Sequence, residues 1–334
     1  MKRLLQMTVA AGVIALGATA AVKAETVLKL GHYYSVEDFR GKTAQKFADL
    51  VKEKTNGEVT VQVFPNESLV KGREGFQSVA QGVIDMYHTS NVYFAGQVPL
   101  VNIFALPFPP AGFDDEALYA FNADPRVKKI FAERMADANV MNLGTVNSTG
   151  DAHMYFRTPV RNLEDMEGKM VRVGGGYADR AMQLIGASVA SLSAAEQFLA
   201  LQTGTVDGIG TTHSSYVRFR LDEVAPYHLE VSFLRIPYWI IMNKRKWDSL
   251  SSEVQAQINE AIDGTQAWSK EHFDAEQEKL LTQVRNKAKE NIVISPEEQA
   301  RWEARMEPLQ ALFIEDNGAA AKELLEIMAE YSKK

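Results

Sequence analysis

Cysteine is absent from this 334-residue chain. Its absence excludes disulfide bonds, metal sites built on thiolates, and cysteine nucleophiles. Long apolar runs are also scarce, because after residues 4–21 no segment is long and apolar enough to cross a bilayer. A chain of this length exceeds the usual size of a single hydrophobic core, so we expect two lobes that their cores alone must stabilise.

The first 24 residues are typical of an export signal. Lys2 and Arg3 precede the apolar run, and residues 22–24 offer small side chains where a signal peptidase reads them. The run is rich in alanine and glycine and is followed at once by polar sequence, which favours a cleaved signal over a membrane anchor. We therefore predict a signal peptide at residues 1–24, with cleavage after Ala24.

The net charge is negative, at −7 for the whole chain and −10 without residues 1–24, which hold three basic residues and no acidic one. An acidic surface repels phosphate backbones, so nucleic acid is not an expected partner.

Strand and helix patterns alternate along the first half of the chain. Apolar strands are predicted at residues 26–30, 59–63, 83–87 and 140–146, with helical spacing between them, and residues 101–108 suit an irregular buried segment. The polar run 147–151 is the expected first crossing between lobes. Residues 229–242, broken by Pro237, are the expected return, and a long helix from residue 252 to about 290 follows. This order predicts an α/β fold.

Polar and aromatic residues follow two of these strands, in residues 31–34 and 88–93. Ligands of open α/β sheets bind beyond the carboxyl ends of strands, so Tyr33, Ser90, Asn91 and Tyr93 are candidate contacts. A solvated turn at residues 88–91 is an equally weighted alternative.

Arg172 lies between Val171 and Val173 in a predicted strand of the segment 164–208. A guanidinium buried there needs a planar anionic partner, which is either a bound carboxylate or a core acid such as Asp207. The glycines at 174–176 do not match a dinucleotide-binding motif, because Asp179 occupies the place of the third glycine. We interpret them as a tight turn. Downstream, Ser193 and Glu196 form a capping box for a helix ending at Thr203.

Catalytic and metal-binding motifs are not evident. The six histidines are dispersed without metal-binding spacing, and no G-x-S-x-G elbow occurs. We therefore predict no metal, no cofactor and no catalysis. The alternative from another class is an exported enzyme that uses His153 or His213 as a base on a small acid.

Several motifs in order resemble one known family, the extracytoplasmic substrate-binding (DctP-like) subunits of tripartite ATP-independent periplasmic (TRAP) transporters. The likeness covers nearly all of the chain after residue 24. The motifs that carry it are FA to KTNG at 47–57 with VFP at 63–65, GVIDM at 82–86, FALPF at 104–108, LEDMEGKMVRV at 163–173 and EQFLALQTGTVDG at 196–208.

This resemblance implies a two-lobe fold like that of type II periplasmic binding proteins, with crossing hinge strands and a long helix spanning both lobes. The implied bounds are lobe I at 25–149 and 237–276, lobe II at 150–236 and 277–305, and C-terminal helices at 306–334. It also implies that a periplasmic monomer closes around a small organic acid, that Arg172 clamps the carboxylate, and that the complex docks on a TRAP membrane permease. An ABC-type binding protein shares these lobes and differs in its transport partner.

Two departures from the family pattern limit what carries over. Some members have a second arginine near position 153, where this chain has His153, and many have asparagine where it has Thr211. Aromatic residues such as Trp239 are further candidates for the pocket wall. We predict a monocarboxylate ligand with an aromatic, hydroxy or oxo group. The predicted contacts are Arg172, Thr211, His153, Asn91, Ser90, Tyr33, Tyr93 and Trp239.

Overall fold

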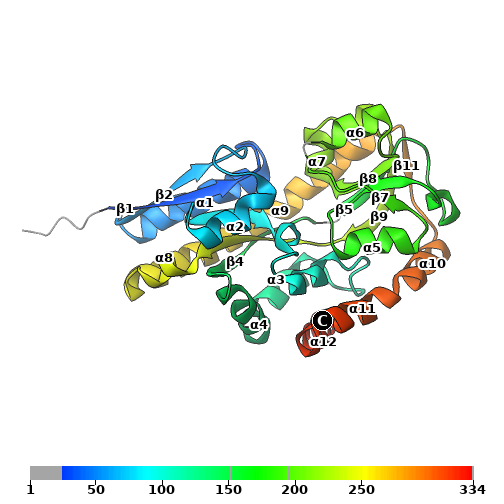
Figure 1. Ribbon diagram of the computed structural model, residues 1–334. Coiled ribbons are helices and arrows are strands. Elements are labelled where there is room, and N and C mark those ends of the chain that lie inside the picture. The colour runs from blue at the N-terminus through cyan, green and yellow to red at the C-terminus, as the bar shows by residue number, and fades with distance from the viewer. Residues whose placement is uncertain (1–24, 151, 195, 333–334) are drawn as a thin grey trace, which may run out of the picture.

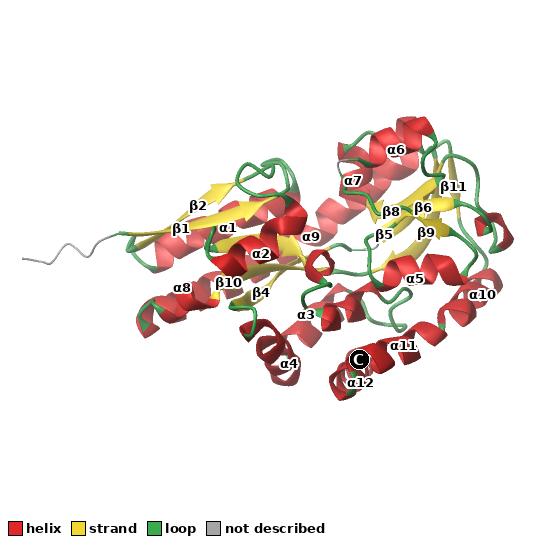
Figure 2. Ribbon diagram, viewed as in Figure 1, coloured by secondary structure: helices red, strands yellow, loops and turns green. Residues whose placement is uncertain are grey.

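The computed structural model describes residues 25–150, 152–194 and 196–332 of the chain. Two mixed β-sheets lie side by side, each with helices packed against it (Figures 1 and 2). This confirms the predicted α/β fold with two lobes. The predicted signal peptide, residues 1–24, lies outside the described residues.

The first sheet, called sheet A, has the strand order β2-β1-β3-β10-β4. The first three strands of that order are parallel, and β10 is antiparallel to both of its neighbours. The strands are β1 (Thr26–His32), β2 (Val59–Phe64), β3 (Met86–Ser90), β4 (Val140–Ser148) and β10 (Pro237–Asn243). The accompanying helices are α1 (Phe39–Lys54), α2 (Gly75–Gln81), α3 (Asp115–Ala123), α4 (Pro125–Ala136) and α8 (Lys244–Asp248), with 3₁₀ segments η1 (Gly72–Glu74), η2 (Asn91–Phe94) and η3 (Pro99–Ala105).

Alternation along the strands of sheet A gives the sheet two apolar faces. Leu28, Met86 and Ile240 pack with α1 and α9 on one face, whereas Tyr87 and Trp239 join the core around η2 and η3 on the other. Successive side chains of a strand point to opposite faces. The parity of a residue, that is, its odd or even position along the strand, therefore decides on which face of the sheet its side chain lies.

The second sheet, called sheet B, has the order β11-β9-β5-β8-β6-β7. Its strands are β5 (Ala152–Phe156), β6 (Met170–Arg172), β7 (Ser188–Val189), β8 (Gly208–Thr212), β9 (Tyr227–Leu234) and β11 (Glu290–Ile292). Helices α5 (Tyr177–Leu184), α6 (Gln197–Thr203) and α7 (His213–Arg218), with 3₁₀ segments η4 (Glu164–Met166) and η5 (Leu221–Glu223), complete this half.

Two crossings join the sheets, from β4 to β5 and from β9 to β10, and they are bonded to each other. The Thr149 amide donates to the Ile236 carbonyl and the Ile236 amide donates to the Thr149 hydroxyl, both at 2.9 Å. The long helix α9 (Ser252–Lys287) packs on α1 and β4 at one end and on α7 further along. The predicted crossings and spanning helix are confirmed.

The chain ends in three helices, α10 (Pro296–Met306), α11 (Pro308–Asn317) and α12 (Ala319–Ser332). The first two contact α5 beside sheet B, and α12 contacts α3 and α4 beside sheet A, so this arm bridges both halves (Figure 1). In the described ranges, no helix combines the length and apolar character that a membrane crossing requires.

Two predicted boundaries were wrong. The strand predicted at 83–87 is β3, Met86–Ser90, because Gly82 ends α2 in the left-handed conformation and Val83 is 60% exposed. Residues 101–108, predicted as irregular, lie partly in η3.

Candidate functional site

Arg172 ends β6 and is 4% exposed. Its Nε donates to the Leu192 carbonyl at 3.0 Å, and among the described residues no carboxylate lies within ion-pair distance of it. Asp207, the alternative partner, instead accepts from the Met170 amide at 2.8 Å. Burial lowers the pKa of the Arg172 guanidinium, while the Tyr93 phenol acts in the opposite direction. The site therefore holds a buried cation that makes no ion pair with the described residues, although the Asp179 carboxylate acts on it from a longer distance, and such a group favours a bound anion.

Strand register brings two further predicted residues onto the face of Arg172. Arg172 pairs with Ile209 of β8, and Thr211, two residues on, pairs with His153 of β5. Paired residues of adjacent strands share a face of the sheet, so Arg172, Thr211 and His153 point the same way, at the end of sheet B next to the crossings. Thr211 also accepts a long hydrogen bond from Gln197 of α6 at 3.5 Å.

Sheet A contributes the carboxyl end of β3 and the start of η2. Ser90 is buried on the face that packs against α1, and Asn91 is 0% exposed. Neither amide atom of Asn91, nor either ring nitrogen of His88, hydrogen-bonds to another described residue. A buried polar group without a partner is costly, so this cluster at the carboxyl end of β3 favours a polar ligand or ordered water beside it.

Tyr33 and Tyr93 stack on each other with ring centroids 5.1 Å apart, and the Tyr33 hydroxyl accepts from the Ser90 amide at 3.3 Å. Both rings line a cavity of about 490 Å³ with walls from both halves of the molecule. The lining includes Arg73, Ser193, Glu196 and Arg218. Two predicted contacts, Tyr33 and Tyr93, thus line this cavity, and Ser90 lies next to Tyr33, whereas Asn91, Arg172, Thr211 and His153 are not among its lining residues.

Trp239 lies elsewhere. Its indole is fully buried against Phe94, Phe104 and Phe131, and its Nε1 donates to Asn122 Oδ1 at 3.2 Å. Trp239 pairs with Thr89, whose parity opposes that of Ser90. The prediction of Trp239 as a pocket-wall contact is therefore corrected, since this residue belongs to the core.

Arg40 is a residue of this region that the sequence reading missed. Its guanidinium binds Asp38 through two hydrogen bonds, donates to the Tyr238 hydroxyl at 2.9 Å, and donates to Ser214 Oγ of α7 at 2.8 Å. The last bond joins the two halves. Asp38 caps α1. The sequence signal that could have identified Arg40 was an acidic residue just before a predicted helix and two residues before an arginine.

The turn and capping predictions around Arg172 are confirmed in outline. Gly175 and Gly176 adopt positive φ, which is consistent with a tight turn before α5. The Glu196 carboxylate accepts from the Ser193 amide at 2.8 Å, which is one half of a capping box, and α6 begins at Gln197 and ends before Gly204.

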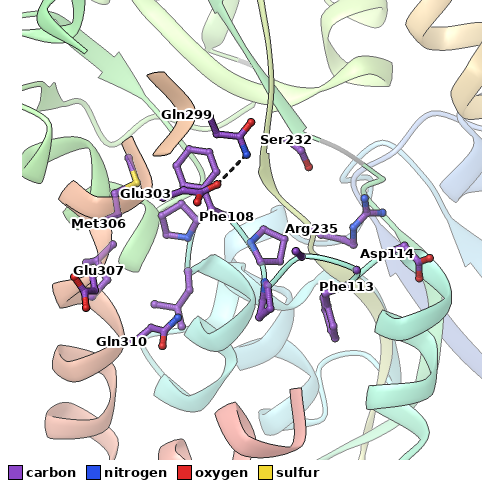
Figure 3. Close-up of a pocket in the computed structure, with 17 residues that line it drawn as sticks. Phe108, Phe113, Asp114, Ser232, Arg235, Gln299, Glu303, Met306, Glu307 and Gln310 are labelled. Atoms are coloured by element: carbon purple, nitrogen blue, oxygen red, sulfur yellow. Dashed lines mark hydrogen bonds between the residues drawn. The ribbon is translucent and has the colours of Figure 1, made fainter. Parts of the chain in front are cut away.

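A second cavity, of about 510 Å³, lies between the β9–β10 crossing and the C-terminal helices (Figure 3). Arg235 and Ser232 line one wall, and Gln299 and Glu303, hydrogen-bonded at 2.8 Å, line another. The polar residues of its α10 and α11 wall are exposed. The cavity lined by Tyr33 and Tyr93 is the better candidate because Tyr93 interacts with the buried Arg172 guanidinium. In the described ranges, no cluster of three or more histidine and acidic residues could hold a metal ion.

Two α/β lobes, two crossings and buried polar residues between them define a two-lobed binding protein. The chain belongs to the bacterial extracellular solute-binding protein family 7 (DctP), whose model matches residues 30–316. This confirms the family that the motifs indicated, and its members bind solutes, in agreement with the prediction of binding without catalysis.

Individual relatives agree with this family and fold. The chain is 26% identical over 321 residues to the C4-dicarboxylate-binding periplasmic protein DctP of Rhodobacter capsulatus, covering 95% of this chain and 96% of that protein. A TRAP periplasmic solute-binding protein from Desulfovibrio salexigens, solved with orotic acid, superposes with a TM-score of 0.85 at 23% identity, covering 92% and 99% of the two chains. One from Pseudomonas aeruginosa, solved with L-malate, gives 0.78 at 24% identity, covering 85% and 98%.

Proposed function

We propose that this protein captures a small organic acid in the periplasm, holds its carboxylate through Arg172, and delivers it to the membrane subunits of a TRAP transporter. The observation that carries the proposal is the buried guanidinium of Arg172, which makes no ion pair with a carboxylate of the described residues. Family membership and the carboxylic acids bound by the structural neighbours support it.

The remaining contacts in the proposal are Thr211, His153, Asn91, Ser90, Tyr33 and Tyr93. They come from both sheets, so a ligand that bridges them has a higher affinity for the closed arrangement than for an open one. Binding then shifts the population toward closure. The Arg40–Ser214 hydrogen bond is a contact that only the closed arrangement makes in this scheme.

The proposal keeps the predicted lobe bounds and a monomeric state. Sheet membership supports lobe I at 25–149 and 237–276 and lobe II at 150–236 and 277–305, because the strands of sheets A and B divide at the two crossings. The C-terminal arm, residues 306–334, then braces both lobes.

The test is the substitution Arg172→Ala. Solute released from freshly purified, denatured wild-type protein is identified by mass spectrometry, and its affinity is measured by calorimetry. Truncating a desolvated charge pair costs about 2–5 kcal/mol, or roughly 30-fold or more in Kd. We expect Arg172→Ala to lose ligand-induced thermal stabilisation, and Arg172→Lys to restore only part of it.

Arg134, an exposed arginine of α4, supplies the matched control. Arg134→Ala should bind as wild type does, and circular dichroism should show both alanine variants folded. Tight binding by Arg172→Ala would refute the proposal, and chemical conversion of the solute by the wild-type protein would favour an enzyme instead.

A further inference from the structure

A chain of hydrogen bonds runs across sheet B from β11 to His153. At its far end, Asn291 Nδ2 donates to the Arg285 carbonyl at 3.0 Å. A carbonyl oxygen only accepts, so this bond fixes the orientation of the amide and directs Oδ1 toward His228 Nδ1, 2.8 Å away. Because Oδ1 also only accepts, the proton of His228 lies on Nδ1.

The hydrogen bond between His228 and His153 then determines which ring nitrogen of His153 carries the proton. His228 Nε2 lies 2.8 Å from His153 Nδ1. In a neutral His228 protonated on Nδ1, Nε2 carries a lone pair and accepts a hydrogen bond. His153 Nδ1 therefore carries a proton and donates it, and the lone pair of a neutral His153 lies on Nε2.

The surroundings keep both rings neutral. Burial lowers the pKa of His228 and lowers that of His153 to about 2, and Arg285 adds positive charge nearby. The carboxylate beside His228 in the described part of the chain, that of Glu230 at 3.9 Å, is held by two hydrogen bonds of 2.7 Å from Arg285. An imidazolium would therefore be buried without a free counter-ion.

The side-chain hydrogen bond that His153 makes to the described residues is the one through Nδ1 to His228, which leaves Nε2 available, and the ring, 6% exposed, lies on the face that carries Thr211 and Arg172. We propose that His153 is a specificity-determining contact that accepts a hydrogen bond, so the solute is a carboxylic acid with a hydroxyl or N–H group facing it. A keto oxygen or a second carboxylate at that position has no proton to donate. Its lone pairs would face the lone pair of His153 Nε2, which is unfavourable. This inference rests on the proposed function and narrows its ligand class.

The proton positions are testable without any ligand. Long-range ¹H–¹⁵N spectra of histidine-labelled full-length protein, with the His153→Gln variant for assignment, distinguish protonated from unprotonated ring nitrogens. We expect protonated Nδ1 and bare Nε2 in both His153 and His228 from pH 8 to pH 5.5. A proton on His153 Nε2, or a titrating His153, would overturn the inference while leaving the role of Arg172 intact.

The ligand class is tested with matched pairs of acids, lactate against pyruvate and 2-hydroxyglutarate against 2-oxoglutarate, and with pyroglutamate as the N–H arm. Among acids whose binding depends on Arg172, the hydroxy or N–H acid should bind about tenfold or more tightly than its oxo counterpart. His153→Phe should abolish that preference. Asn291→Leu, which removes the acceptor that orients His228, should weaken it.

Oxo acids that bind as tightly as their hydroxy counterparts, with binding still dependent on Arg172, would refute this inference and leave the proposed function standing. If released solute and every tested acid bind equally well to Arg172→Ala, the proposed function fails first. The two failures are thus separate.

Discussion

Gly176, in the turn after Arg172, has a φ of +64°, and a Cβ added there would lie 2.1 Å from Asn102 Oδ1. Alanine at this position must therefore bear both an unfavourable φ and a displaced Asn102. We expect Gly176→Ala to lower the free energy of unfolding by about 2–3 kcal/mol, measured by chemical denaturation.

Gly168 separates the two causes, since its φ is +74° but no atom lies within 4 Å of an added Cβ. Gly168→Ala should cost only the conformational strain, about 1 kcal/mol. Equal costs for the two variants would show that the approach of Asn102 does not matter.

Substitution of Trp239 tests whether this residue belongs to the core or to the ligand site. The ring packs among three phenylalanines and its Nε1 donates to Asn122. Trp239→Phe should destabilise the fold by about 1–3 kcal/mol through a smaller ring and an unpaired Asn122 oxygen, with the Kd for the solute unchanged. Titration calorimetry alongside denaturation measures both quantities. A weakened Kd at unchanged stability would return Trp239 to the ligand site.

At the scale of elements, α1 and α7 meet through Arg40 and Ser214 at 2.8 Å. Ser214→Ala removes this bond while Arg40 keeps Asp38 and Tyr238. If the bond forms only on closure, we expect the Kd to rise about 2- to 5-fold, since one hydrogen bond contributes roughly 0.5–1 kcal/mol net. Thermal stability of the ligand-free protein should hardly change. An equal loss of stability without ligand would show that the bond also exists in the open state.

The elements were largely predictable because their signals are local. Alternating valines marked β2, Gly204 marked the end of α6, and Pro237 marked the start of β10. The start of β3 was missed because Val83 continues the apolar pattern although it lies outside the strand. The apolar pattern of a short segment does not show whether an apolar residue lies in the turn after a helix or in a strand of the sheet.

Arg172 was predictable as a site residue because a single arginine between two valines of a buried strand needs a partner for its charge. Trp239 was misplaced because its face depends on pairing with Thr89, and β10 has irregular register at Tyr238 and Trp239. The proton arrangement of His153 depends on Asn291, which is 138 positions away in sequence. Such long-range contacts have no signature in a single sequence.

At the scale of the whole molecule, both halves bury neutral histidines. Burial lowers the pKa of His32 to about 4 and of His153 to about 2, and it also lowers the pKa of His88 and His228. In the unfolded chain these groups titrate near 6.5. Below that pH the unfolded chain binds protons at these histidines and the folded protein does not. The contribution of these histidines to the free energy of unfolding, present above pH 6.5, is therefore lost as the pH falls.

Stability should therefore decrease from pH 7 to pH 5.5 by about 1 kcal/mol each for His32 and His153, and His88 and His228 should add to the decrease. Asp124, with a pKa of about 2 in the fold, loses its contribution only near and below the ordinary pKa of an aspartate, so it does not contribute in this window. Urea denaturation of the ligand-free protein at pH 7, 6.25 and 5.5 measures the change. His153→Gln should make stability depend less steeply on pH, by about the contribution of one histidine. A stability that stays constant or rises on acidification would mean that the buried rings take up protons in the folded state, and the neutral hydrogen-bond chain through His153 would fail with it.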